Sequence, residues 1–240
     1  MLPTLKALLG ANPYPGRGVL LGRSESGKAA LAAYFLMGRS ENSRNRILVR
    51  VPDGVRTQAV DPARVTDPSL ILYAPVRYLP DGLIVTNGDH TDTVAACLAR
   101  GASLEAALDT REYEPDAPHY TPRIAGLLRT AGGAVSCRLA ILRRTAGGAC
   151  ERAYFPAFAP APGEGRLLHT YAGDGDPLPP FAGAPRAVAL PETARELATA
   201  LYQALDARNR VAVYACAIDL ATGARTEHVI NRLEAPGARN

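Results

Sequence analysis

Several features are scarce or missing in this sequence of 240 residues, and each absence excludes a class of protein. No apolar run is long enough to span a bilayer, and residues 1–18 lack the charged start and long apolar stretch of a secretory signal. Tryptophan is absent, aromatic residues make up 6%, and lysine occurs only at Lys6 and Lys28. We therefore expect a soluble, cytoplasmic protein that does not bind membranes.

The basic charge balance is weak evidence for nucleic-acid binding. The net charge is +4 and the pI is near 9.0, but the arginines are spread along the chain. No aromatic side chains alternate with them to form a platform on which bases would stack. We expect no nucleic-acid partner.

Cysteine and histidine spacing predicts no metal site. The cysteines stand at positions 97, 137, 150 and 216 without a C-x-x-C pair, and the histidines at 90, 119, 169 and 228 do not cluster. A cytoplasmic protein of this size also has no need of disulfides.

The alternation of apolar runs and turn residues predicts one α+β domain over residues 1–240, with mainly antiparallel sheets. An N-terminal segment, 1–17, and a C-terminal tail, 233–240, are expected to be peripheral. Helices are predicted from about residue 91 to 108, interrupted at Gly101, and over residues 191–206. Strands are predicted at residues 18–23, 29–37, 46–51, 69–78, 83–86, 123–128, 134–142, 150–158, 166–172, 210–218 and 226–230.

The most informative stretch is the polar run GRSENSRNR over residues 38–46, between two apolar segments. Its position predicts a β-hairpin loop, and its three arginines favour a phosphate or carboxylate ligand, because guanidinium groups pair bidentately with such anions. A solvated surface turn is the alternative. Further polar segments follow at NGDHTDT (residues 87–93), at Tyr113-Glu114 and at TPRI (residues 121–124).

Together with Tyr73 in SLILYAPV, these segments resemble the archaeal-type inosine monophosphate (IMP) cyclohydrolase family, in order from about Gly16 to Ile124. The resemblance implies a four-layer α-β-β-α sandwich like that of the N-terminal-nucleophile hydrolases. It also implies closure of the purine ring of a formamido-imidazole-carboxamide ribonucleotide, without a cofactor. Pro115 departs from the family pattern, in which a lysine is expected.

The resemblance further implies the site residues. The catalytic residues would be Arg46, Tyr73, Asn87 and Glu114. Arg46 and Asn87 would hold the formyl or carboxamide oxygens, Tyr73 would protonate the departing oxygen, and Glu114 would orient or deprotonate the carboxamide. The substrate-binding residues would be Arg39, Ser40, Arg44, Asn45, Thr121 and Arg123; Arg39, Arg44 and Arg123 are the phosphate candidates, by charge alone.

Three other motifs are interpreted as structural. Residues 22–28 have the Walker A spacing, but Ala29 cannot supply the hydroxyl that holds magnesium, so we predict a hairpin turn. The chain begins Met1-Leu2, without the Thr, Ser or Cys of an N-terminal nucleophile. The pKa of a histidine lies near neutrality, so His90 could be a general base. We favour the alternative that residues next to His90 cap a helix and that His90 is only adjacent to them.

Two alternative functions stay open on the sequence. One is a cyclase or hydrolase of another ribonucleotide, and the other is a non-catalytic nucleotide-binding module. The sequence also leaves a homo-oligomer open.

Overall fold

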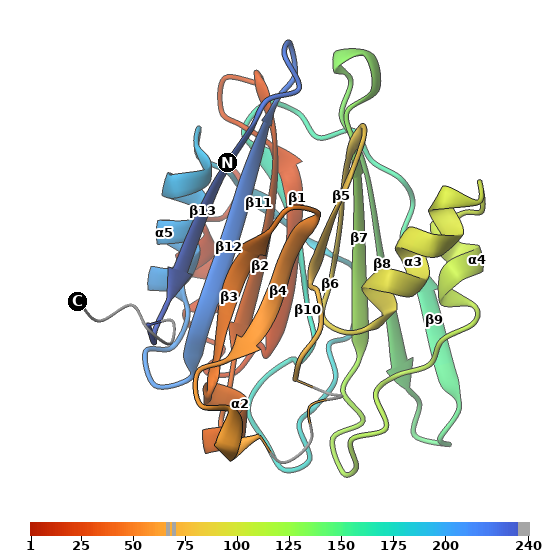
Figure 1. Cartoon of the computed structure of the whole chain (residues 1–240), viewed down its shortest axis with the longest axis vertical. Coiled ribbons are helices and arrows are strands. Elements are labelled where there is room, and N and C mark those ends of the chain that lie inside the picture. The colour runs from red at the N-terminus through yellow and green to blue at the C-terminus, as the bar shows by residue number, and fades with distance from the viewer. Residues whose placement is uncertain (66–67, 69–70, 235–240) are drawn as a thin grey trace.

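The computed structural model describes residues 1–65, 68 and 71–234. In this part of the chain the strands form two antiparallel sheets that face one another (Figure 1). The first sheet has the strand order β11-β10-β1-β2-β12-β13. Its strands are β1 (Arg17–Arg23), β2 (Ala29–Met37), β10 (Glu164–His169), β11 (Arg186–Ala189), β12 (Arg210–Asp219) and β13 (Arg225–Asn231).

The second sheet runs in chain order from β3 to β9. Its strands are β3 (Arg46–Val51), β4 (Gly54–Ala59), β5 (Val76–Leu79), β6 (Gly82–Thr86), β7 (Arg123–Arg129), β8 (Ser136–Arg144) and β9 (Cys150–Tyr154). The α-helices are α1 (Leu5–Leu9), α2 (Glu41–Arg44), α3 (His90–Ala99), α4 (Leu104–Leu108) and α5 (Ala194–Ala204), with short 3-10 turns at Pro62–Arg64 and Ala131–Gly133. None of the helices in the described ranges is long and apolar enough to cross a membrane.

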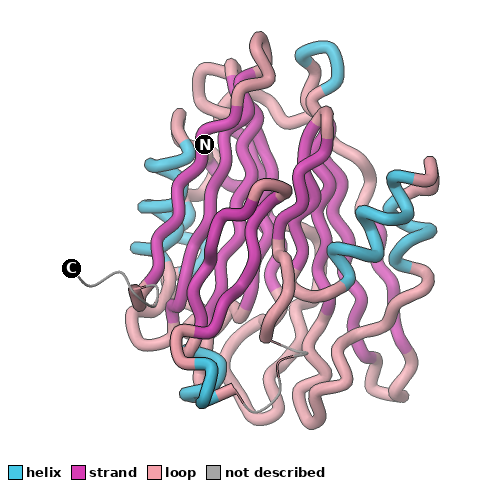
Figure 2. Tube along the Cα trace, viewed as in Figure 1, coloured by secondary structure: helices cyan, strands magenta, loops and turns pink. Residues whose placement is uncertain are grey.

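Helices cover the outer face of each sheet, which gives four layers (Figure 2). α1 and α5 pack on the first sheet, and α3 and α4 pack on the second. The N-cap Thr193 and Glu196 form a capping box that starts α5, and Leu197 and Leu201 are buried. The predicted α+β sandwich with antiparallel sheets is confirmed, while the likeness to N-terminal-nucleophile hydrolases stays a prediction.

Strand β2 shows how the layers sort the side chains. Because one face of the first sheet meets the second sheet and the other meets helices, β2 is apolar and buried on both faces. Ala32, Tyr34 and Leu36 face the second sheet, while Ala33 and Phe35 face the helices. The same alternation on β1 and β3 turns their first residues, which are arginines, toward the space between the sheets.

The polar run at residues 38–46 is not the loop of a hairpin, and that prediction was wrong. β2 lies in the first sheet and β3 in the second, so this segment carries the chain across the sandwich and includes α2. Adjacency in the chain indicated strand pairing, but both edges of β2 are already paired, with β1 and with β12, so β3 joins the other sheet. By contrast, residues 22–28 do contain the turn of the β1–β2 hairpin, as predicted.

Other elements differ from the sequence expectation. The strands β4 and β11 and the helices α1 and α2 were not predicted. Of the strand expected at residues 69–78, the structure has β5 from Val76 onward, and residues 69 and 70 lie outside the described part. Leu5 and Leu9 are buried beneath α5, so the N-terminal segment packs into the fold instead of lying peripherally. Most of the expected C-terminal tail, 235–240, lies outside the described residues.

Candidate active site

The strands β1, β3 and β7 begin, and β2 and β6 end, at one end of the sandwich (Figure 1). Buried polar side chains gather at this end. Strands β1 and β7 approach each other closely near this end, and the glycine at position 126 of β7 makes this possible. A Cβ at Gly126 would lie only 2.7 Å from Val19 Cγ1 of β1. Arg17 and Arg46 stand two residues before the core residues Val19 and Leu48, so both face between the sheets. This end of the fold therefore brings together residues that are far apart in the sequence.

The crossing segment 38–46 is held by its own polar side chains. Ser40 is the N-cap of α2 and forms a capping box with Ser43. Arg44 donates from Nε to the Gly38 carbonyl and from Nη2 to Asn209 Oδ1. The Asn45 side chain forms two hydrogen bonds with the Asp61 backbone. Its Nδ2 donates to the Asp61 carbonyl at 2.7 Å, and its Oδ1 accepts from the Asp61 N–H at 2.9 Å. These contacts fix the direction in which the next residue points.

Arg46 is fully buried, and most of its hydrogen-bonding capacity is unused. Its Nε donates to the Ser43 carbonyl at 2.9 Å, but neither Nη1 nor Nη2 has a partner among the residues that the structure describes. Burial lowers the pKa of the Arg46 guanidinium, and the neighbouring Arg17 adds to this. A buried guanidinium without a counterion is costly, so this position is suited to oxygen atoms of a ligand.

Arg17 lies beside Arg46 and lines a cavity of about 340 Å³. Its side chain is buried, and its Nε also finds no partner within the described residues. The phenol of Tyr73 and the carboxyl of Glu114 are among the groups close enough to interact electrostatically with it. The two arginines, one from each sheet, give this end of the molecule a positive interior.

Two tyrosines from the facing layers meet next to these arginines. Tyr34 Oη on β2 lies 2.7 Å from Tyr73 Oη, and both side chains are buried. Thr57 of β4 fixes the Tyr73 backbone, because its Oγ1 accepts from Tyr73 N at 2.9 Å and its N–H donates to Tyr73 O at 2.8 Å. Burial is the main cause that raises the pKa of Tyr34 well above its usual range, and the nearby Tyr73 phenol raises it further.

Glu114 is the buried carboxyl group of the cluster. Burial raises its pKa to about 7, although the guanidinium groups of Arg17 and Arg123 act in the opposite direction. Its Oε1 lies 3.9 Å from Arg123 Nη1, whereas Oε2 has no hydrogen-bond partner in the described part of the chain. A Cβ at Gly88 would come within 3.0 Å of Oε1, so glycine is needed where the β6–α3 turn passes Glu114. This carboxyl can both lose and gain a proton near neutral pH.

Asn87 and Arg123 connect the neighbouring strands β6 and β7. Asn87 Nδ2 donates to the Pro122 carbonyl at 2.8 Å, and its Oδ1 accepts from Ile124 N at 2.7 Å. Arg123 Nη1 forms an ion pair with Asp89 Oδ1 at 2.6 Å. Both of these predicted site residues are buried, and in this structure they bind protein groups.

His90 is the first residue of α3 and is buried, with Nε2 3.1 Å from the Ile124 carbonyl and Nδ1 3.1 Å from Arg123 Nη1. Burial lowers the pKa of His90 to about 3, so the ring is neutral at physiological pH. The expected capping residues were Asp89, Thr91 or Asp92. Asp89 stands at the N-cap of α3 but makes no cap hydrogen bond, and its side chain pairs with Arg111 and Arg123 instead.

The cavity opens between α2 and two loops. Arg39 and Ser40 line it on one side, and Glu114, Asp116 and Thr121 line it on another. Arg39 pairs with Asp174 at 2.6 Å and lies over the Tyr14 ring, 5.2 Å from its centroid. Arg46 and Tyr73 do not line this cavity but lie beside Arg17, which does.

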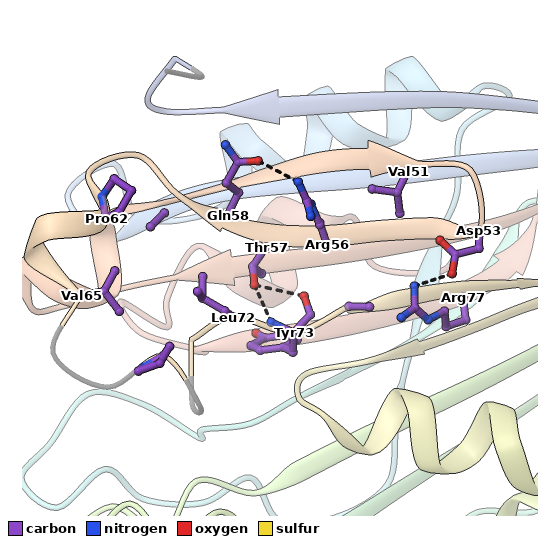
Figure 3. Close-up of a pocket in the computed structure, with 13 residues that line it drawn as sticks. Val51, Asp53, Arg56, Thr57, Gln58, Pro62, Val65, Leu72, Tyr73 and Arg77 are labelled. Carbon is purple, nitrogen blue, oxygen red and sulfur yellow. Dashed lines mark hydrogen bonds and ion pairs between the residues drawn. The ribbon is translucent and has the colours of Figure 1, made fainter. Parts of the chain in front are cut away.

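A larger hollow of about 1050 Å³ lies along β4 (Figure 3). Arg77 at its edge is paired with Asp53, and Arg56 contacts Gln58. None of its described lining residues is a buried charged side chain. The charged groups that are perturbed or lack a partner in the described part of the chain lie around the smaller cavity, which we therefore take as the candidate site. Tyr73 lines the larger hollow and reaches this site through its hydroxyl contact with Tyr34.

The structure brings together all four predicted catalytic residues at this end, and it adds residues that the sequence did not indicate. The additions are Arg17, Tyr34, Tyr14, Tyr171 and Asp116. Arg17 and Tyr34 had one detectable signal, because each is a polar residue at an inward-facing position of an otherwise apolar strand. Their approach to Arg46 and Tyr73 depends on contacts between the two sheets, such as that of Tyr34 with Tyr73 across 39 residues, which local patterns do not reveal.

The arrangement is suited to an anionic or oxygen-rich ligand. Two guanidinium groups can hold oxygens, the Tyr34–Tyr73 pair can transfer a proton, and Glu114 can act as an acid or base. The described residues contain no cluster of three or more His, Cys, Asp or Glu that could hold a metal ion.

Comparison with known proteins agrees with this chemistry. Curated IMP cyclohydrolases match the chain: that of Methanopyrus kandleri is 34% identical over 167 residues, covering 66% of this chain and 75% of the relative. That of Methanosphaera stadtmanae is 32% identical and covers 50% of this chain and 59% of the relative. That of Thermococcus kodakarensis is 33% identical and covers 50% of this chain and 58% of the relative. The matches to the last two relatives therefore span less than two thirds of the length of each relative.

The family model described as "IMP cyclohydrolase-like protein" matches residues 14–223, which include every residue of the candidate site. The chain belongs to the IMP cyclohydrolase-like family.

Proposed function

We propose that this protein is an IMP cyclohydrolase, which closes the purine ring of 5-formamidoimidazole-4-carboxamide ribonucleotide to give IMP and water. The observation that carries the proposal is that the buried Nη groups of Arg46 have no partner among the described residues and lie beside Arg17, Glu114 and the Tyr34–Tyr73 pair. Membership of the family gives the chemistry that such a cluster would serve.

The reaction joins two groups of one molecule. The carboxamide nitrogen attacks the formyl carbon, and the formyl oxygen then leaves as water with one proton from each of the two nitrogens. Because the reactants are already linked, the first task is to hold the formyl group in the rotamer that faces the carboxamide. The amide nitrogen is a poor nucleophile, so proton transfer and stabilisation of the developing oxygen charge must supply further rate.

Each buried group has a role in this proposal. Arg46, with Arg17, binds the formyl oxygen and stabilises its negative charge as the tetrahedral carbon forms. Tyr73 protonates this oxygen as it departs, and Tyr34 orients the Tyr73 hydroxyl. Glu114, whose pKa of about 7 keeps part of it ionised at neutral pH, takes the proton from the carboxamide nitrogen.

The remaining predicted residues support or anchor the substrate. Asn87 is bonded to the backbone on either side of Arg123, so we assign it to positioning the β7 end beside Glu114. Arg39 and Ser40 at the cavity wall are our candidates for the substrate phosphate. Arg44, Asn45 and Arg123 do not line the cavity and are bonded to protein groups, so they would shape the site instead. Homo-oligomerisation and a cytoplasmic location remain predictions.

The test is to incubate purified protein with the formamido ribonucleotide and to follow ring closure by ultraviolet absorbance. Formation of IMP at a rate proportional to protein concentration supports the proposal. A folded protein that binds IMP but closes no ring would favour the non-catalytic nucleotide-binding module.

A further inference from the structure

A chain of hydrogen bonds leads from Asp116 to the cavity. Both carboxylate oxygens of Asp116 accept from Thr121: Oδ1 from the backbone N–H at 2.6 Å, and Oδ2 from the hydroxyl. Thr121 Oγ1 in turn lies 2.5 Å from Tyr171 Oη. Asp116, Thr121 and Tyr171 all line the candidate site.

The connecting loop is tightly constrained. Glu114 N donates to the Thr121 carbonyl at 2.9 Å, so the loop closes on itself around Asp116. Tyr120 has a φ of 45°, in the left-handed region that side chains other than glycine rarely adopt. Such strain is kept only where the surroundings enforce it, and here it places Thr121 between the carboxylate and the phenol.

The direction of each bond follows from the number of hydrogens. A carboxylate only accepts, so the single hydroxyl hydrogen of Thr121 points to Asp116. Thr121 Oγ1 is then an acceptor toward Tyr171, and the phenol must donate its only hydrogen to Thr121. Any group that Tyr171 binds on its other side must therefore be a donor.

Tyr171 is well placed to select a ligand by this property. Its side chain is 1% exposed, and its ring stacks on Tyr14 with centroids 5.9 Å apart and planes 19° from parallel. The Arg17 guanidinium is close enough to interact with it electrostatically. A rigid phenol in a buried wall discriminates between ligands, because a ligand without the matching group leaves a buried polar atom unpaired.

We infer that Tyr171 is a specificity-determining residue that accepts a hydrogen bond from a donor on the nucleotide, and that Asp116 and Thr121 are positioning residues that fix its direction. This inference rests on the proposed function. The donor belongs either to a ribose hydroxyl or to a ring N–H, and the probes below separate these two sources.

The decisive variant is Asp116→Asn, which keeps the shape but reverses the chain. With the amide oxygen facing Thr121 N, the amide NH₂ faces Thr121 Oγ1 and donates to it. The Thr121 hydroxyl then turns toward Tyr171, and the phenol hydrogen turns toward the cavity. Tyr171 changes from an acceptor to a donor without the loss of a heavy atom.

The experiment measures the affinities of IMP, 2′-deoxy-IMP, 3′-deoxy-IMP and N1-methyl-IMP by calorimetry. We expect wild type to bind one of the three analogues about 2- to 10-fold more weakly than IMP, the range expected for one neutral hydrogen bond. In Asp116→Asn a preference for the ring N–H should disappear, because an N–H cannot accept from the phenol. A ribose hydroxyl can also accept, so a preference for it is tested by Tyr171→Phe, in which it should disappear. If Asp116→Asn does not fold, the pair Thr121→Val and Thr121→Ser provides the same comparison, with the preference lost in the first and restored in the second.

Two results would overturn the inference while leaving the proposed function intact. One is wild type that closes the ring yet binds all four nucleotides equally. The other is a preference for the ring N–H that is unchanged in folded Asp116→Asn or Thr121→Val, or a preference for a ribose hydroxyl that is unchanged in folded Tyr171→Phe. If wild type neither binds IMP nor closes the ring, the proposed function fails and this inference fails with it.

Discussion

Tyr34 Oη and Tyr73 Oη lie 2.7 Å apart, although Tyr34 belongs to the first sheet and Tyr73 is bonded to β4 of the second. The pair thus joins the two sheets beside Arg46. If Tyr73 protonates the departing oxygen, Tyr34 sets the direction of its hydroxyl, and removing either hydroxyl should affect the chemical step more than binding.

Tyr73→Phe keeps the ring and its packing while removing only the hydroxyl. We expect kcat to fall at least about tenfold, equivalent to roughly 1.4 kcal/mol of transition-state stabilisation, with the affinity for IMP nearly unchanged. Tyr34→Phe should reduce kcat less, and the double variant should be no worse than Tyr73→Phe alone. Steady-state kinetics check this, with Tyr202→Phe on α5 as the matched control. Additive losses would show that the two phenols act independently.

Arg46→Lys keeps the positive charge but loses the planar fork. We expect turnover to fall at least about tenfold, because a lysine cannot hold two oxygens in the fixed geometry of a guanidinium. Arg50→Lys is the control, since Arg50 lies on the same strand but is exposed, and it should keep wild-type turnover. Equal turnover in the two folded variants would remove Arg46 from the mechanism.

The pH dependence of kcat/KM should report Glu114. As the base it must be ionised, and burial raises its pKa to about 7, so kcat/KM should rise with pH and level off above this value. Glu114→Gln should lower the plateau and abolish this limb of the profile. A limb near pH 7 that persists in Glu114→Gln would assign the titration to another group.

The same shift predicts an effect on stability. The pKa of Glu114 is higher in the folded protein, about 7, than its ordinary value of 4.5, so folding favours the protonated form. Its contribution to stability is complete below pH 4.5 and is lost as pH rises through 7.

Glu114→Gln lacks this titration, so its Tm relative to wild type should increase between pH 5 and pH 8. Burial lowers the pKa values of His90 and His169 to about 3 and about 4, which destabilises both proteins equally in acid. The difference in Tm between the two proteins, measured across pH, isolates Glu114. A constant difference would contradict the raised pKa.

The sequence revealed those parts of the fold that depend on local pattern. The α5 helix is visible because Pro191 stands at the start of the segment, Glu192 follows it, and leucines recur on one face. Strands β1 and β2 and the turn between them follow from apolar runs and turn residues. The crossing from β2 to β3 was missed because only the pairing of β2 with β12 shows that β3 cannot join the same sheet.

The site was predictable to a similar extent. Arg46 was recognised from the arginine-rich segment, and Glu114 only through the family resemblance. Arg17 escaped notice because nothing near it in the sequence indicates that Arg46 will lie beside it. Asn87 was expected to bind substrate, whereas its amide is engaged by the β7 backbone, a contact across 35 to 37 residues.

The most direct test of the account is ring closure by wild type and by the Arg46→Lys, Tyr73→Phe double variant, measured with EDTA present because the chemistry needs no Lewis acid. Lys28→Ala serves as the control, since Lys28 lies in the turn at the other end of β1 from Arg17. We predict that wild type and Lys28→Ala convert the formamido ribonucleotide to IMP at equal rates. The folded double variant should still bind IMP but should turn over at least about tenfold more slowly. Wild-type turnover in the folded double variant, or no ring closure by wild type, would contradict the account.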